Sequence, residues 1–241
     1  MFMIDLPLDA ARLMRFTHRQ GHRLTAGEDF GYAAHAWLAA TLGEQAPKPF
    51  RLLENRQGLR MLGYANQSIE ALTDHAHVFA EPDALSVCTW SDAAGKSMPD
   101  SWQQGRRLGF EVRACPVSRA DRERDVYLVA VSRAEAAATE PPTRPQVYAE
   151  WIGRQLNKED AAQIVPNVID LIGFQRVRSQ RHTHATGGNK HRSIERPDAL
   201  FAGELMIENP DAFARLLARG IGRHRAFGFG MLLLRPPRQA D

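Results

Sequence analysis

The chain has 241 residues, of which 44% are hydrophobic and 24% charged, and its formal net charge is +3, so it has the apolar content of an ordinary globular protein with a core. Its two cysteines, Cys88 and Cys115, exclude a disulfide framework, lack the spacing of metal ligands and indicate a reducing compartment. The N-terminal apolar segment is too short for a signal peptide, and no apolar run reaches about 18 residues. We therefore expect a soluble, cytoplasmic protein without a membrane span.

The first 42 residues predict a strand, a basic segment and a helix. Residues 1–8 are typical of a strand, and residues 12–27 form a basic segment that we interpret as a loop contacting phosphate. The basic residues of this segment include Arg15, His18, Arg19, His22 and Arg23. A helix is expected to begin near Asp29, its N-cap, and to continue to Leu42 before Gly43.

The next elements complete an alternating pattern of strands and helices. Residues 50–54 and 59–64 predict two strands of a hairpin, and Ser68 predicts the cap of a second helix. We expect the apolar side of this helix to carry Ile69, Leu72, Val78 and Phe79. Residues 108–117 alternate between apolar and charged side chains, which predicts a strand. The resulting β-α-β-β-α-β order is that of a ferredoxin-like domain, which we place at residues 1–118.

The second half predicts a similar set of elements. Residues 126–131 resemble a strand, and three prolines between residues 141 and 145 indicate a linker that leads to a helix over residues 147–156. A strand over 199–207, a helix over 211–219 capped by Asn209, and a strand over 231–234 follow. The most economical architecture is α+β, with two similar modules in tandem, the second at residues 119–241.

A basic ribbon occupies residues 176–192. It contains five Lys or Arg residues and three His residues but neither Asp nor Glu. Such a local excess of positive charge is typical of phosphate binding, although a solvated charged loop has the same composition. The ribbon residues expected to contact a phosphate backbone are Arg176, Arg178, Arg181, Lys190 and Arg192.

A glycine loop spans residues 220–230, where four glycines enclose Arg223, His224 and Arg225. Glycines allow positive φ and let backbone N–H groups approach a phosphate. The spacing fits neither the dinucleotide fingerprint nor the Walker A loop. Two interpretations stay open: an anion-binding loop, in which Gly220 and Gly222 also contact a phosphate backbone, or a helix C-cap followed by a strand. Phe227 and Phe229, which alternate with glycine, are expected in the core.

Four segments together resemble a known family. They are Tyr32-x-x-His35 in the first predicted helix, residues 107–116, the basic ribbon, and residues 201–213 continuing into the glycine loop. With them the chain resembles the CRISPR-associated repeat-processing endoribonucleases of the repeat-associated mysterious protein superfamily. The resemblance is to the branch that serves type I-E and, in some hosts, type IV systems. It covers most of the chain but is weak over residues 82–104 and 132–165.

The resemblance implies two tandem ferredoxin-like (RRM-like, βαββαβ) domains and an enzyme that cuts CRISPR precursor RNA within the repeat, at a stem-loop, without metal or cofactor. Such cleavage uses the 2′-OH beside the scissile phosphate and leaves a 5′-OH and a 2′,3′-cyclic phosphate. By resemblance, His35 is the general acid or base, and Tyr32 orients the 2′-OH or the phosphate. The implied partners are precursor RNA, the mature guide RNA to which the protein stays bound, and other subunits of a CRISPR surveillance complex.

Several alternatives stay open at this point. His18, His22 or the arginines of the basic segment could replace His35, and we favour a phosphate-contacting role for that segment, with Arg15, Arg19 and Arg23 binding RNA. A non-catalytic RNA-binding subunit of the same superfamily would keep the ribbon and the glycine loop without needing His35. A phosphate-binding metabolic enzyme would bind a small nucleotide instead.

Overall fold

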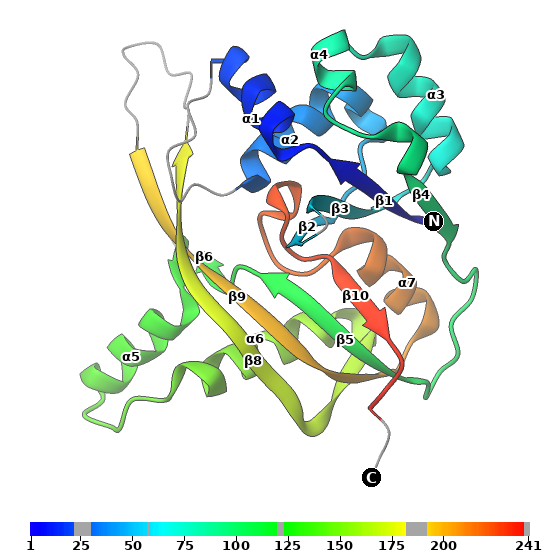
Figure 1. The fold of residues 1–241 in the computed structure, drawn as a ribbon. Helices are drawn as coiled ribbons and strands as arrows, with labels where there is room; N and C mark the ends of the chain where they lie inside the picture. The colour runs from blue at the N-terminus through cyan, green and yellow to red at the C-terminus, as the bar shows by residue number, and fades with distance from the viewer. Residues whose placement is uncertain (22–29, 57, 120–122, 182–191, 239–241) are drawn as a thin grey trace.

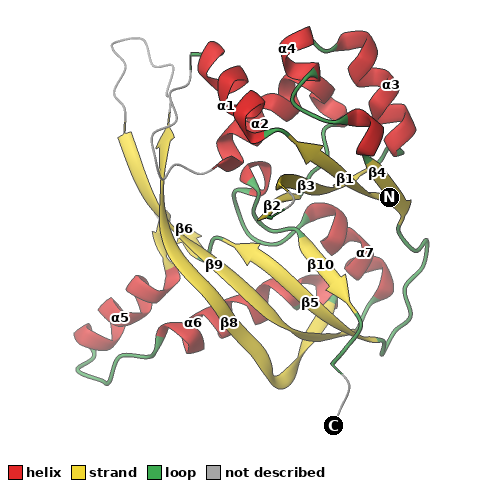
Figure 2. Ribbon diagram, in the orientation of Figure 1, coloured by secondary structure: helices red, strands yellow, loops and turns green. Residues whose placement is uncertain are grey.

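The computed structural model describes residues 1–21, 30–56, 58–119, 123–181 and 192–238, which fold around two four-stranded antiparallel sheets (Figure 1). The first sheet has the strand order β2-β3-β1-β4. Its strands are β1 (Phe2–Leu8), β2 (Phe50–Asn55), β3 (Gly58–Ala65) and β4 (Ala94–Ser97). The helices of this first unit are α1 (Ala10–Arg19), α2 (Phe30–Leu42), α3 (Ile69–Phe79) and α4 (Pro82–Leu85). Figure 2 shows these helices gathered over the first sheet in the upper half of the view, with the second sheet below.

The second sheet has the strand order β10-β5-β9-β8. Its strands are β5 (Arg107–Ala114), β8 (Ala162–Arg181), β9 (Arg192–Ile207) and β10 (Leu232–Arg235). The helices of this second unit are α5 (Val126–Ala136), α6 (Arg144–Leu156) and α7 (Pro210–Arg219), and a small ladder joins β6 (Val117–Arg119) to β7 (Glu123–Asp125). In both sheets the four strands of a βαββαβ unit lie in the order fourth, first, third, second. The prediction of two tandem ferredoxin-like folds is therefore confirmed.

Strand β5 lies in a different sheet from the one we expected. The sequence interpretation made it the last strand of the first unit, but it pairs with β9 and β10 and is the first strand of the second unit. That sheet assignment was wrong, because alternating side chains predict a half-buried strand without identifying its neighbours. The division at residue 118 concerned folding units, which strand pairing does not test, so it stays a prediction.

Two segments expected to be loop or strand are helices. Asp9 accepts a hydrogen bond from the backbone N–H of Arg12 (2.9 Å) and caps α1, which buries Leu13 and Phe16, so the basic segment begins as an amphipathic helix. Residues 126–131, expected as a strand, belong to α5, because Asp125 caps this helix by accepting from the N–H of Tyr127 (2.9 Å). Tertiary context and capping here outweigh the β-propensity of the valines.

Two of the predicted caps are confirmed, the predicted cap Asp29 lies outside the described residues, and one predicted helix face is wrong. Ser68 accepts from the N–H of Ala71, and Asn209 accepts from the N–H of Ala212, so α3 and α7 begin where expected. Val78 and Phe79, expected on the buried side of α3, are 71% and 70% exposed. They lie in its last turn, beyond the buried Leu72 and Ala76.

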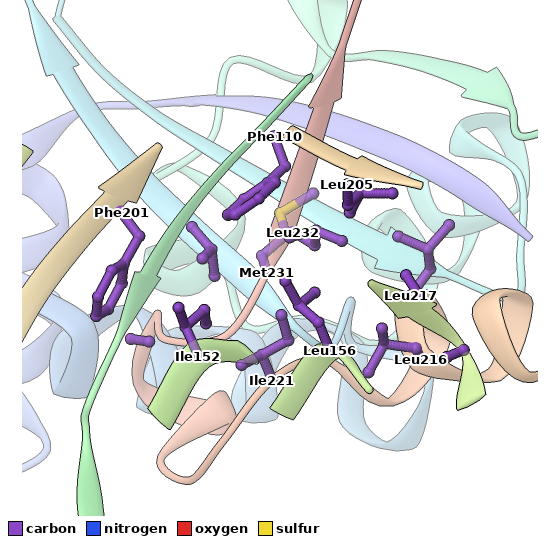
Figure 3. Packing of buried hydrophobic residues seen from close by; sticks show 14 of the residues in the cluster. Phe110, Ile152, Leu156, Phe201, Leu205, Leu216, Leu217, Ile221, Met231 and Leu232 are labelled. Carbon is purple, nitrogen blue, oxygen red and sulfur yellow. The ribbon is translucent and has the colours of Figure 1, made fainter. Parts of the chain in front are cut away.

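The second unit contains the larger core, which also joins the two units. Figure 3 shows Ile152 and Leu156 of α6 packed with Leu216 of α7 beneath Phe110 of β5. The Tyr64 hydroxyl of β3 donates a hydrogen bond to the Leu232 carbonyl of β10 (2.8 Å), and Arg51 of β2 pairs with Glu111 of β5 (2.6 Å). These contacts hold the first sheet against the second, and so position helix α2 relative to the glycine loop.

Candidate active site and nucleic-acid interface

Helix α2 presents Tyr32 and His35 on the side away from its buried face. Ala34 and Trp37 are fully buried in the core of the first unit, and the Trp37 indole donates a hydrogen bond to the Ala84 carbonyl (2.8 Å). Residues three apart project from the same side of a helix, so Tyr32 and His35 lie together and are half-buried. The spacing predicted from the sequence therefore does bring the two side chains together.

The ring of Phe227, in the glycine loop, lies against both side chains. It stacks on Tyr32 with ring centroids 6.2 Å apart, and His35 meets it edge-on at 5.0 Å. Figure 1 shows the orange-red loop between α7 and β10 reaching up past β2 toward α2. Phe229 is buried as expected, whereas Phe227 is partly exposed and adds a contact between the two units. The fold thus brings the proposed catalytic helix and the glycine loop to one place.

The surroundings define the protonation of these two groups. Burial lowers the pKa of His35, and the nearby Lys48 ammonium lowers it further, so the imidazole is neutral near pH 7. Burial raises the pKa of Tyr32, so its phenol keeps its proton. His35 can therefore accept a proton, and Tyr32 can donate a hydrogen bond. Lys48 was not identified from the sequence, where it is a lone lysine between two prolines.

All four glycines of the loop adopt positive φ, between 70° and 85°. Gly220 is also the C-cap of α7, as one of the two sequence interpretations predicted. A Cβ on Gly220 would come within 2.8 Å of Pro49, and one on Gly222 within 2.9 Å of the Trp151 ring. Positive φ and close packing therefore require glycine at these positions whether or not a ligand binds. The contact of these glycines with RNA stays a prediction.

Arg223 and His224 of the loop converge on one carboxylate. Glu123 of β7 lies 2.8 Å from Arg223, 3.0 Å from His224 and 3.7 Å from Arg196 of β9. Arg225 instead donates to the carbonyl of Arg219 (2.5 Å). Neither Glu123 nor Arg196 was identified from the sequence, because nothing in the local pattern links them to the glycine loop.

The arginines of α1 lie on the exposed face of that helix. Arg19 forms an ion pair with Asp83, whereas Arg15 is exposed and free of ion pairs with described residues. His18 is exposed as well. Arg23 and His22 lie outside the described residues.

Residues 176–181 and Arg192 of the basic ribbon lie in the outer part of the long β8–β9 hairpin, which extends beyond the rest of the second sheet (Figure 1). Arg176 pairs with Glu195 across the hairpin (3.4 Å), and the backbone of Arg178 also lies opposite Glu195. Arg181 and Arg192 lie opposite one another in the last described pair of the ladder. Lys190 lies outside the described residues. The described ends of the ribbon therefore lie on paired antiparallel strands, and the RNA contacts of the ribbon stay predictions.

The inner part of this hairpin is held by a buried ion pair that the sequence did not reveal. Arg113 of β5 makes two 2.8 Å hydrogen bonds to Asp198 of β9, and its guanidinium lies 4.6 Å from the centroid of the Phe229 ring. Gln175 donates a third hydrogen bond to Asp198 (2.7 Å). This network fixes the base of the hairpin relative to the glycine loop, and so relative to Tyr32 and His35.

Comparison with known families identifies the chain. The family described as "CRISPR associated protein" matches residues 1–236. The chain belongs to this family. No curated protein sequence matches it significantly.

Solved structures share the fold of this CRISPR-associated protein. A structure of the CRISPR endoribonuclease Cse3 bound to 19 nt RNA aligns with a TM-score of 0.66 at 17% identity, covering 98% of this chain and 100% of the other. Cas6e from Escherichia coli K-12 aligns with a TM-score of 0.52 at 17% identity, covering 98% and 100%. A chain of a CRISPR RNA-guided surveillance complex, pre-nicking, aligns with a TM-score of 0.54 at 16% identity, covering 98% and 100%. At this identity the matches establish the fold.

Two other features, a membrane-spanning helix and a metal-binding cluster, can be assessed over the described residues. Within them, every helix is too short or too polar to cross a lipid bilayer. Likewise, this part of the chain holds no group of three or more histidine, cysteine or acidic side chains placed to bind a metal ion. What it does gather around Phe227 is a phenol and two half-buried imidazoles, those of His35 and His224. Arg196 and Arg223 meet Glu123 beside His224, so the site has groups that can transfer protons and groups that can stabilise a phosphate.

Proposed function

We propose that this CRISPR-associated protein is an endoribonuclease that cuts CRISPR precursor RNA within the repeat, next to a stem-loop, without a metal ion. The observation that carries the proposal is the meeting of His35 and Tyr32 with Phe227 of the glycine loop. The RNA-bound Cse3 endoribonuclease, which shares the fold over 98% of this chain, supports the same substrate class. The 2′,3′-cyclic phosphate and the 5′-OH are the expected new ends.

The geometry suits attack by the 2′-OH on the neighbouring phosphorus. The neutral imidazole of His35 removes the 2′-OH proton, the new P–O2′ bond forms, and the P–O5′ bond breaks. Tyr32 donates a hydrogen bond that orients the 2′-oxygen or the phosphate, since its phenol keeps its proton. Arg223 and the backbone N–H groups of the loop stabilise the charge that grows on the phosphate oxygens.

Two basic surfaces on either side of this site would hold the stem of the RNA. The β8–β9 hairpin carries arginines beyond the sheet, and Arg15 lies on the exposed face of α1. A-form RNA has a deep, narrow major groove, so these residues are expected to contact phosphates and read the shape of the stem. Their contribution to affinity should fall as salt concentration rises.

The proposed partners follow from the product. A protein that holds the stem by many phosphate contacts releases it slowly after cutting, so the mature guide RNA is expected to stay bound. The fold shared with a chain of a CRISPR RNA-guided surveillance complex supports incorporation into such a complex together with the RNA.

The test is single-turnover cleavage of a labelled repeat hairpin in EDTA. The wild-type protein should cut at one site, and a 2′-deoxy substitution at the nucleotide 5′ to the cut should abolish cleavage. His35→Asn should slow cleavage by about 100-fold or more, and Tyr32→Phe should slow it less. His77→Asn, on the exposed side of α3, is the matched control and should cut normally.

The outcomes separate the candidate functions. Unchanged cutting by His35→Asn would move the chemistry to His18, His22 or the arginines. Tight, salt-dependent binding without cutting would favour the non-catalytic RNA-binding subunit. Failure to bind hairpin RNA at low ionic strength would refute the proposed function.

A further inference from the structure

Cleavage of this kind needs two proton transfers, and His35 performs one of them in any single step. One group removes the 2′-OH proton, and another gives a proton to the 5′-oxygen as it leaves. Around Phe227 the described residues place a second imidazole, that of His224, with ring centroids 6.3 Å apart. Two histidines from different units therefore flank the same ring.

His224 is mostly buried, contacts a carboxylate and has a left-handed backbone, three features that a loop at the surface does not need. Its side chain is 12% exposed, and its Nε2 lies 3.0 Å from each carboxylate oxygen of Glu123. A carboxylate accepts a hydrogen, so Nε2 carries one and Nδ1 is left to face another partner. The backbone of His224 is left-handed, with φ 61° and ψ 26°. Strain of this kind in a residue other than glycine is concentrated at functional sites.

We propose that His224, oriented by Glu123, is the general acid that protonates the 5′-oxygen while His35 acts as the base; this rests on the proposed function. The different neighbours of the two imidazoles assign the roles. A carboxylate stabilises an imidazolium, and Glu123 touches His224. An ammonium disfavours an imidazolium, and Lys48 lies near His35. A neighbour that stabilises the imidazolium suits the acid, and one that disfavours it suits the base.

The charged groups that face His224 determine how readily its imidazole takes up a proton. Glu123 approaches from β7, Arg196 from β9 and Arg223 from the same loop, while Phe227 separates His224 from α2. In the RNA-free protein, burial lowers the pKa of His224, Arg196 lowers it further, and Glu123 opposes them. A phosphate bound at the two arginines adds negative charge beside the ring and favours its protonation. Binding of RNA therefore favours the protonated form of His224, which is the form that a general acid needs.

The proton balance closes over one turnover. The 2′-OH proton passes to His35 as the P–O2′ bond forms, and the proton of His224 passes to the 5′-oxygen as the P–O5′ bond breaks. The products are a 2′,3′-cyclic phosphate and a 5′-OH. The two imidazoles finish with exchanged protonation and return to their starting states by exchange with solvent.

The experiment compares two substrates, the natural repeat hairpin and one with sulfur in place of the 5′-oxygen at the cut. A thiolate leaves without protonation, so a variant that lacks only the general acid should cut the sulfur substrate normally. The variant is His224→Asn, because asparagine tolerates the left-handed backbone and does not titrate. On the natural substrate it should be slower by about 100-fold or more. On the sulfur substrate it should lie within about threefold of wild type.

Two further variants complete the design. His35→Asn should be slow on both substrates, since it lacks the base, and Glu123→Gln should show a smaller version of the His224 pattern. Normal cutting of the natural substrate by His224→Asn would overturn the inference while leaving the proposed function intact. Equal slowing on both substrates would also overturn it and would make His224 a binding or packing residue. Absence of cutting by wild type would refute both.

Discussion

The glycine loop offers a direct test of how tightly it is packed against helix α6, through Gly222→Ala. Gly222 has φ 70°, and a Cβ there would lie 2.9 Å and 3.2 Å from two carbons of the Trp151 ring, which is 5% exposed. The left-handed backbone costs an alanine roughly 1 to 2 kcal/mol. Crowding a rigid buried ring costs about 1 to 3 kcal/mol more. The free energy of unfolding should therefore fall by about 2 to 5 kcal/mol.

The assay is urea unfolding followed by tryptophan fluorescence, and Gly105→Ala is the matched control. Gly105 has φ 75°, but a Cβ there would meet nothing within 4 Å, so this variant reports the backbone strain alone. It should lose about 1 to 2 kcal/mol. Equal losses in the two variants would show that Trp151 yields to the added methyl group and that the loop is not closely packed.

Three further predictions concern charge. Arg113→Ala should lower the free energy of unfolding by about 3 to 5 kcal/mol in urea titrations, because it leaves the buried carboxylate of Asp198 without its cationic partner. The free energy of unfolding should also fall as pH drops below about 6.5, because the unfolded chain takes up protons that buried His35 and His224 resist; His35→Asn should flatten this decline. Arg15→Ala should weaken RNA binding and reduce the slope of log affinity against log salt by roughly 0.7 to 0.9, measured by fluorescence anisotropy.

Each of these predictions has a result that would contradict it. Adding Asp198→Asn to Arg113→Ala should recover part of the lost stability, and a cost below about 1 kcal/mol for Arg113→Ala alone would contradict the buried-pair argument. An unchanged decline in His35→Asn would contradict the argument that burial of this imidazole makes stability depend on pH. Arg133→Ala, on the exposed side of α5, should leave the salt slope unchanged; a slope equally unaffected by Arg15→Ala would remove α1 from the RNA-binding surface.

Much of the local structure could be predicted from short stretches of sequence. Ser68 and Asn209 mark the starts of α3 and α7, and the Tyr32-x-x-His35 spacing puts both side chains on one face of α2. These features depend on hydrogen bonds and side-chain directions within one or two turns. The same local reasoning failed for residues 126–131, where the Asp125 cap favours a helix over the strand that the valines suggest.

The amino-acid sequence alone thus determined the helix caps, the strand periods and the two-unit pattern of the family. Only the tertiary structure decided that β5 joins the second sheet, that Phe227 meets His35, and that Glu123 gathers Arg196 and His224. The physical reason is that caps and periodicity act between neighbours in the chain. Strand partners and buried ion pairs depend instead on how segments that are distant in sequence pack together. No single segment carries a motif that identifies its partner.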